Sequence, residues 1–122
     1  MKMKNQKHKV FKARCYKFTL GVMKLIETFP NKKIYWSLGD QLFRSASSIG
    51  ANIIEARAAS SKRDYINFYQ TALKSANEVK YWLSLVRDSG IGDQKLVIEL
   101  LKEAEELSNI IGASVLTLKG KR

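Results

Sequence analysis

Residues 65–86 read YINFYQTALKSANEVKYWLSLV, and this stretch decides the fold. Apolar and small side chains recur along it at alternating steps of four and three residues, as Tyr65, Tyr69, Ala72, Ala76, Val79, Leu83 and Val86. That spacing places them on one face of an α-helix. Ser61 with Asp64 before the stretch is typical of a capped helix start, and Gly90 after it is typical of a left-handed helix end. The pattern predicts a helix over residues 62–87.

Three further stretches have the same spacing and predict helices over residues 9–29, 37–59 and 93–118. Their expected inner faces are, in chain order, Phe11, Cys15, Phe18, Val22, Leu25 and Phe29; Leu38, Leu42, Ser45 or Ala46, Ile49, Ile53 and Ala56; and Val97, Leu100, Ala104, Leu107, Ile111, Ser114 and Leu118. Pro30 should end the first helix, Ser37 with Asp40 should cap the second, and Asp93 should cap the fourth. Because the connectors are short, consecutive helices should run antiparallel. The predicted fold class for residues 1–122 is a single all-α domain, an antiparallel up-down-up-down four-helix bundle, with residues 1–8 as a mobile basic arm.

Charge points to the kind of partner. The chain has 122 residues, with 22 Lys and Arg against 11 Asp and Glu, which gives a formal net charge of +11. A basic excess of this size favours a polyanion such as nucleic acid. No acidic residue occurs before Glu27, whereas the fourth helix is acidic and could pair with the basic arm of another subunit. The alternatives for the N-terminal lysines are a solubilising tail and a membrane-surface helix, and the weak apolar pattern before Val10 disfavours the second.

Basic side chains at three places are candidates for contacts with nucleic-acid phosphates. They are Lys2, Lys4, Lys7, Lys9, Lys12, Arg14 and Lys17; Lys32 and Lys33; and Lys62 and Arg63. Lys32 and Lys33 precede Tyr35 and Trp36, so the lysines could neutralise phosphates while an aromatic ring stacks on an unpaired base. The alternative is that both aromatic side chains close the end of the bundle.

Few residues are available for catalysis or metal binding. Cys15 is the only cysteine and His8 the only histidine, so the usual zinc ligand sets and an intrachain disulfide are excluded. The chain also has no Gly-rich phosphate loop and no Glu-x-x-His pair of a di-iron bundle. We therefore expect no catalytic residue, no metal and no cofactor. A lone cysteine favours a reducing compartment, and no apolar run reaches the ~20 residues of a membrane span, so we expect a cytoplasmic protein without membrane association.

The second predicted helix carries a polar face beside its apolar one. Arg44, Ser48, Asn52 and Glu55 are spaced by four, four and three residues and therefore share one side of the helix. Small residues lie around them and favour the close approach of another helix. We interpret this face as a contact with a neighbouring helix or with a second subunit. The alternatives are a solvated face and a surface ion pair of Glu55 with Arg44 or Arg57.

The third and fourth predicted helices have large apolar residues away from their inner faces. These residues are Phe68, Trp82 and Leu85, and Leu96, Leu101 and Ile110. Such side chains would leave an exposed apolar patch on a monomer, and large patches usually mark an interface. We therefore expect a homo-oligomer with Phe68 and Trp82 at the subunit interface.

Three motifs point to a known family. Residues 38–42 read LGDQL, residues 44–55 read RSASSIGANIIE, and residues 60–65 read SSKRDY. Together with the helices over residues 11–116, they resemble the four-helix-bundle proteins encoded in intervening sequences of bacterial 23S rRNA genes. The accessory protein of diversity-generating retroelements is related to that family. Family members often have Gly after the final Glu of the second motif, where this chain has Ala56.

The resemblance implies a bundle that assembles into a ring, usually a pentamer, and binds nucleic acid through a basic surface without known catalysis. In the retroelement relatives the protein partner is a reverse transcriptase. The first functional hypothesis is therefore a non-enzymatic, oligomeric protein that binds RNA or DNA mainly through phosphates. The second is a protein-interaction scaffold, for example an accessory subunit of a nucleic-acid-processing enzyme.

Overall fold

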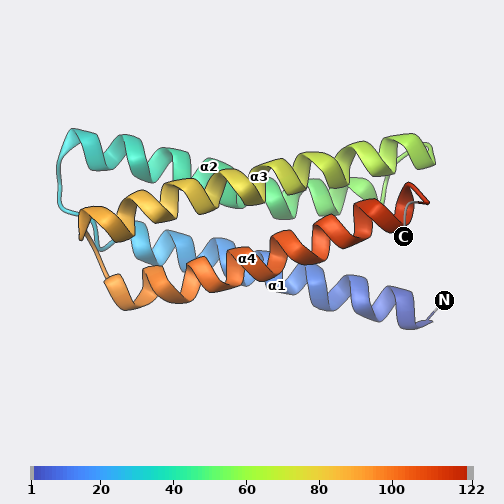
Figure 1. The fold of residues 1–122 in the computed structure, drawn as a ribbon, viewed down its shortest axis with the longest axis horizontal. Helices are drawn as coiled ribbons and strands as arrows, with labels where there is room; N and C mark the ends of the chain where they lie inside the picture. Colours follow the sequence, from blue (N-terminus) through green and yellow to red (C-terminus); the bar gives the residue numbers. More distant parts are fainter. Residues whose placement is uncertain (1, 121–122) are drawn as a thin grey trace.

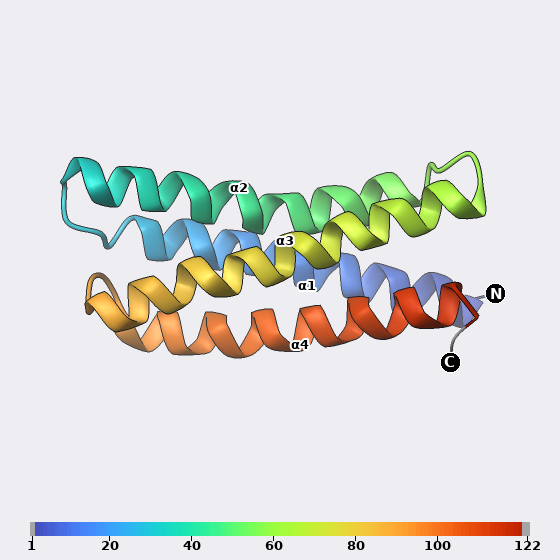
Figure 2. The same cartoon turned by 45° about the horizontal axis from the view of Figure 1, so that its top comes forward.

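A computed structural model describes the backbone of residues 2–120 and the side chains of residues 6–120. Four helices follow one another along the chain: α1 (Lys2–Ile26), α2 (Lys33–Ala56), α3 (Lys62–Ser89) and α4 (Gln94–Leu118). Each packs against its two neighbours, in the order α1, α2, α3, α4 and back to α1, and consecutive helices run in opposite directions (Figure 1). This arrangement confirms the predicted all-α, up-down-up-down four-helix bundle. Both chain ends lie at the same end of the bundle (Figure 2).

The predicted inner faces form one continuous core. Nearly all of their side chains are buried, and Phe29, Leu38, Tyr65 and Leu118 are partly buried and pack against that core. The fourth helix differs at one position, because Val115 is buried where Ser114 was expected. The four-three spacing of apolar residues therefore identifies the core of this bundle almost completely.

The first helix is displaced towards the N-terminus relative to the prediction. It begins at Lys2 rather than Lys9, so residues 2–8, predicted as an arm, continue the helix. No proline or glycine interrupts this stretch, and lysine and glutamine are good helix formers. The helix ends at Ile26 rather than Phe29. The backbone N–H groups of Thr28 and Phe29 bond to the carbonyls three residues before them, those of Leu25 and Ile26, at 2.9 and 3.0 Å, and this tighter turn ends the α-helix.

The second helix begins earlier than predicted, and the cap assigned to Ser37 was wrong. The helix starts at Lys33, after an extended residue, Lys32, whose side chain makes no capping bond. The carbonyl of Lys32 accepts from the backbone of Tyr35 and Trp36, both at 3.0 Å. This turn places Ser37 inside the helix, and the helix ends at Ala56 rather than at Ala59.

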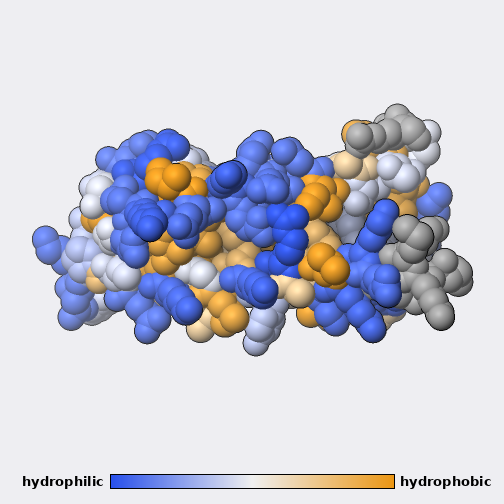
Figure 3. Space-filling view, turned by 90° about the horizontal axis from the view of Figure 1, so that it is seen from below, coloured by the Kyte–Doolittle hydropathy of each residue, from blue (hydrophilic) through white to orange (hydrophobic). Residues whose placement is uncertain are grey.

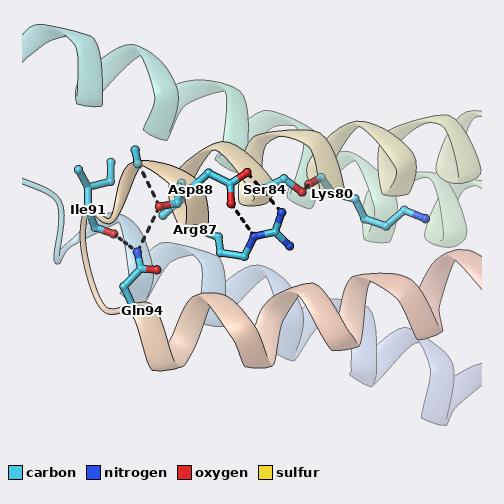
Figure 4. A network of polar contacts seen from close by, with 8 residues as sticks. Lys80, Ser84, Arg87, Asp88, Ile91 and Gln94 are labelled. Atoms are coloured by element: carbon cyan, nitrogen blue, oxygen red, sulfur yellow. Dashed lines mark hydrogen bonds and ion pairs between the residues drawn. The ribbon is translucent and has the colours of Figure 1, made fainter.

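The other predicted helix caps, Ser61, Gly90 and Asp93, are confirmed. Ser61 accepts from the backbone N–H of Asp64 and Asp93 accepts from that of Leu96, both at 3.1 Å. Gly90 ends α3, which extends to Ser89 rather than Arg87, with a left-handed φ of 75°. Beyond it, the amide of Gln94 donates to the carbonyls of Val86 and Ile91 at 3.1 and 2.8 Å (Figure 4).

A hydrogen bond joins the two turns at the end of the bundle remote from the termini. The backbone N–H of Asp93, at the start of α4, donates to Thr28 Oγ1 in the connector after α1 at 2.9 Å. Gly92 lies against the same connector and has a φ of 70°. A Cβ at this position would lie 2.8 Å from Thr28 Oγ1 and 3.0 Å from the Phe29 ring. We call this contact between Thr28, Phe29, Gly92 and Asp93 the turn clamp.

Two alanine substitutions should separate backbone strain from steric crowding in this turn. Gly90→Ala should lower the free energy of unfolding by about 1 kcal/mol, because Gly90 has a left-handed backbone but open space around it. Gly92→Ala should lower the free energy of unfolding by at least about 1 kcal/mol more than Gly90→Ala does, because the new Cβ also crowds the turn clamp. Urea unfolding followed by circular dichroism measures both values. Equal losses for the two variants would contradict the clamp.

Candidate nucleic-acid interface

The basic residues of α1 form the largest exposed set of the predicted candidates. Lys7, Lys9, Lys12 and Lys17 are all exposed. Lys2 and Lys4 lie in the same helix, and their side chains lie outside the described part of the structure. The whole helix contains no acidic residue. The exposed lysines therefore give α1 a positive surface along its N-terminal half.

Arg14 differs from these lysines because its charge is paired within the chain. Its Nε donates to Glu103 Oε2 at 3.1 Å and its Nη2 donates to Glu103 Oε1 at 2.6 Å. Glu106 lies 3.5 Å from the same guanidinium. The hydrogen bonds to Glu103 raise the pKa of Arg14. The structure therefore places Arg14 in a bidentate link between α1 and α4, which neutralises much of the charge it was predicted to offer to phosphates.

The acidic residues of α4 point to both of its neighbours. Glu103 and Glu106 pair with Arg14 of α1, and Glu105 lies 3.0 Å from Lys80 of α3. Within one chain, basic α1 and acidic α4 are therefore already linked through Arg14. Figure 3 shows the face that α1 and α4 share, where hydrophilic side chains predominate and hydrophobic ones form separate patches.

The other basic candidates lie at opposite ends of the bundle. Lys32 and Lys33 are at the start of α2, whereas Lys62 and Arg63 are at the start of α3, and all four are exposed. Of the two neighbouring aromatic residues, Tyr35 is half-buried and packs against the core. Trp36 is exposed, and its Nε1 donates to Asn31 Oδ1 at 2.8 Å. Tyr35 thus closes the end of the bundle, while Trp36 is the ring available for stacking.

A cationic notch between α1 and the end of α2 was not predicted from the sequence. His8, Lys9 and Lys12 of α1 line it together with Arg57, the C-cap residue of α2, and Ile54. Its volume is about 370 Å³. Burial, then the charges of Arg57 and Lys12, lower the pKa of His8. Only the packing of α2 against α1 brings Arg57 to this place, so no local sequence pattern could have indicated it.

An apolar groove also runs between α1 and α2, and the sequence reasoning missed it. Its volume is about 810 Å³. Tyr16, Leu20 and Met23 line it from α1, and Phe43 and Ile54 line it from α2. All five are exposed. The same groove is bordered by three lysines, Lys9, Lys12 and Lys17.

The groove has a sequence signal that could have been found. Tyr16, Leu20 and Met23 are spaced by four and three residues, which is a second helical stripe beside the core stripe of α1. On α2, small residues separate Phe43 from Ile54 and keep the groove open.

The predicted interface residues divide into three groups. Ser48 and Asn52 face α3: Ser75 Oγ donates to Ser48 Oγ at 2.8 Å, and Asn52 Nδ2 donates to the same hydroxyl at 3.1 Å. This is the helix–helix contact that was one interpretation of the polar face. Arg44 and Glu55 are exposed, and no ion pair of Glu55 occurs among residues 6–120.

The remaining two interface candidates, Phe68 and Trp82, lie closer to the core than expected. Both are half-buried and pack against it. Trp82 Nε1 also donates to Glu78 Oε2 at 3.0 Å. Leu85, by contrast, is exposed on α3. Most of the apolar area attributed to Phe68 and Trp82 is therefore used within the bundle.

With the bundle and its surfaces described, the chain can be compared with known proteins. The profile of the 23S rRNA-intervening sequence protein family matches residues 6–113. The chain belongs to this family. No curated protein sequence matches the chain significantly.

A solved structure supports the assignment to the 23S rRNA-intervening sequence proteins. It is a crystal structure of a protein of unknown function from the S23 ribosomal protein family of Bacteroides thetaiotaomicron, and this chain is 30% identical to it. The alignment covers 86% of this chain and 97% of that protein, with a TM-score of 0.79. In this member of the 23S rRNA-intervening sequence family, residues 44–55 supply Ile49 and Ile53 to the core and Gly50 to the groove.

Two other kinds of structure do not occur among the described residues. No helix among them has the length and apolar character needed to cross a bilayer. Within residues 6–120 no three His, Cys, Asp or Glu side chains gather as a metal site would require. The thiol of Cys15 is fully buried, and burial raises its pKa to about 12.

The buried thiol of this 23S rRNA-intervening sequence protein should be unreactive in the folded state. At pH 8 the native protein should react with a disulfide reagent about a hundredfold or more slowly than the unfolded chain, because the thiolate is the nucleophile. The release of the coloured thiol, with and without 6 M guanidinium, measures both rates. Rapid reaction of the native protein would show that α1 opens readily from the core.

Proposed function

We propose that the protein is a non-enzymatic, oligomeric nucleic-acid-binding protein that contacts RNA or DNA mainly through phosphates. The single observation that carries this proposal is the exposed lysine series of α1, on a helix that contains no acidic residue. Membership of the 23S rRNA-intervening sequence family favours RNA as the ligand. The proposal includes no catalytic step and no cofactor, and it places the protein in the cytoplasm, where Cys15 would stay reduced.

Binding of this kind gains free energy from the release of counterions. Each lysine that neutralises a phosphate releases condensed cations, so affinity falls as salt rises. Lys7, Lys9, Lys12 and Lys17 lie along one helix, α1, and each offers an ammonium group to phosphate oxygens. We therefore expect strong salt dependence and little sequence preference, since phosphate contacts carry no sequence information directly.

A salt series tests the proposal directly. Fluorescence anisotropy of labelled single-stranded RNA would be measured from 50 to 300 mM salt. If four phosphates are contacted, the logarithm of the affinity should fall with the logarithm of the salt concentration with a slope of about −3. A single strand of the same length and scrambled sequence serves as the comparison for sequence preference. No detectable binding at 50 mM salt would overturn the proposal.

We also infer that the protein forms a homo-oligomer, with a second copy seated in the α1–α2 groove. Exposed Tyr16, Leu20 and Phe43 give the groove an apolar floor that a monomer would leave in water. Exposed Met23 and Ile54 extend this apolar lining. A groove that receives a different face of the next copy makes a head-to-tail contact, which closes into a ring when the rotation between copies divides a full turn. A pentamer rests on the family resemblance alone.

The second candidate function is a protein-interaction scaffold, such as an accessory subunit of a nucleic-acid-processing enzyme. The observation that favours it is the same apolar groove, since grooves of this kind also accept a helix of another protein. The two functions separate experimentally. An oligomer that binds no RNA at low salt supports the scaffold, and salt-dependent RNA binding supports the first proposal.

A further inference from the structure

A small pocket lies beside the exposed ring of Trp36, where the start of α2 packs against the end of α1. Its lining comes from both helices: Met23 and Ile26 of α1, and Trp36, Gly39, Asp40 and Phe43 of α2. Its volume is about 330 Å³, less than half that of the α1–α2 groove, with which it shares Met23 and Phe43. Two aromatic rings and one carboxylate therefore surround a space large enough for one small planar ring system.

The ring of Trp36 is exposed and yet held in one orientation. The residue is 58% exposed, and its Nε1 donates to Asn31 Oδ1 at 2.8 Å. Behind the ring, Gly39 allows α1 to approach closely, because a Cβ at this position would lie 3.0 Å from Cγ2 of Ile26. A ring that is already fixed loses little side-chain entropy when a flat ligand stacks on it.

Four exposed residues of α2 follow one another along the pocket. Lys33, Trp36, Asp40 and Phe43 are spaced by three, four and three residues and therefore share one side of the helix. All four are exposed, and Asp40 has no ion pair among the residues that the structure describes. This side of α2 offers, in order, a cation, an aromatic face, a hydrogen-bond acceptor and a second aromatic ring.

We propose that this pocket binds one unpaired base of the nucleic acid and prefers guanine. The inference rests on the proposed function and deepens it, because it adds one base contact to binding that is otherwise made through phosphates. The base stacks on Trp36, with Met23 and Phe43 beside it, and Lys33 neutralises an adjacent phosphate. Stacking on aromatic side chains is a general way to hold single-stranded nucleic acid, since every base has a flat face.

The carboxylate of Asp40 provides the preference among bases. It accepts hydrogen bonds and donates none. Guanine presents two adjacent donors, N1–H and the amino group, which match the two oxygens of one carboxylate. Uracil presents a single N–H between two carbonyl oxygens, and those oxygens repel the carboxylate. Guanine should therefore bind about tenfold more tightly than uracil, which is towards the lower end for a bidentate contact. Adenine and cytosine, with one amino group each, should lie between them.

The fluorescence of Trp36 gives a direct readout of stacking. The chain has two tryptophans, so Trp82→Phe, with helicity checked by circular dichroism, leaves Trp36 as the single emitter. The probes are uridine pentanucleotides that carry G, A, C or U at the central position. The strand with central G should quench the emission saturably and bind about tenfold more tightly than the strand of uridine alone. Equally tight binding of free GMP would identify a mononucleotide site and overturn the proposal.

Variants of the ring test the stacking contact. Trp36→Leu should weaken binding of the strand with central G about tenfold, whereas Trp36→Tyr should retain most of the affinity because its ring still stacks. Tyr81→Leu is the matched control, since Tyr81 is also an exposed aromatic residue, at 60%, but lies on α3. It should leave the affinity unchanged. Equal losses in Trp36→Leu and Tyr81→Leu would contradict the pocket.

Variants of the carboxylate test the base preference separately from charge. Asp40→Asn should raise the affinity for the strand of uridine alone, because a negative charge is lost, and should reduce the preference for guanine to about threefold or less. Glu99→Gln removes the same charge from an exposed position on α4 and should leave the preference intact. A guanine preference that persists unchanged in Asp40→Asn would contradict the role of Asp40.

The failure of this inference differs from the failure of the proposed function. Salt-dependent RNA binding without quenching of Trp36, and with equal affinity for the four central bases, would overturn the pocket and leave the proposed function standing. Release of monomers in Trp36→Leu, measured by light scattering, would also overturn it, because the ring would then lie at a contact between copies. Absence of RNA binding at 50 mM salt would overturn the proposed function, and the base site with it.

Discussion

A Leu20→Glu substitution should convert the proposed oligomer into monomers without unfolding the bundle. Leu20 is 42% exposed in the single chain, so a carboxylate there remains hydrated when the chain is alone. In the proposed assembly the same side chain lies on the floor of the α1–α2 groove, where a second copy would remove it from water. Burying an unpaired charge at each interface should cost about 3 kcal/mol or more, which weakens association more than about a hundredfold.

Leu85→Glu is the matched control. Leu85 is the same residue type with nearly the same exposure, 41%, but it lies on α3. Its substitution should leave the oligomer intact, as measured by light scattering with helicity checked by circular dichroism. The two variants also distinguish between two candidate interfaces. One is the α1–α2 groove, and the other is the surface of α3 formed by apolar residues away from its inner face. If Leu85→Glu gives monomers and Leu20→Glu does not, the groove is not the interface.

Replacing Lys9, Lys12 and Lys17 together with glutamine should produce the largest loss of RNA affinity. These three exposed lysines lie on the helix that carries the proposed phosphate contacts. If each neutralises one phosphate, the slope of affinity against salt should become less steep by about 2 for single-stranded RNA. Affinity at 100 mM salt should fall at least about tenfold, as measured by fluorescence anisotropy.

The control for this variant removes the same total charge from elsewhere. Lys74, Lys95 and Lys102 are exposed on α3 and α4, and their replacement by glutamine changes the net charge equally. An equal loss of affinity in the control would mean that binding follows overall charge rather than the surface of α1. Arg14→Gln should have a smaller effect than any one of the three α1 lysines, because Arg14 is already paired with Glu103.

The fold was predictable because its main determinant is local. Spacing along residues 65–86 fixes which side of α3 is buried, and the same holds for the other three helices. Helix ends were less predictable. Ser37 has the right chemistry for a cap, yet the turn at Lys32 starts α2 four residues earlier, and no propensity distinguishes those two starts.

The candidate site was predictable in kind and not in detail. Basic composition identified α1 as the positive element, and its lysines from Lys7 onwards are exposed. Whether a given charge is available depends on what lies opposite, which is a property of the packed bundle. Arg14 of α1 bonds to Glu103 of the neighbouring helix α4, and Arg57 at the end of α2 lies near His8 of α1. Both relations join residues from different helices, so the sequence around either residue contains no sign of them.

The turn clamp has a consequence for how the molecule opens. The hydrogen bond between Asp93 and Thr28 joins the start of α4 to the connector after α1. It therefore holds the α1–α2 hairpin and the α3–α4 hairpin together at one end of the bundle. Both chain ends lie at the other end (Figure 1), where fraying normally begins. Transient opening should therefore propagate from the termini towards the clamp, with amide exchange fastest in the first turns of α1. A ligand or a second copy that binds at the termini would therefore stabilise the part of the bundle that opens first.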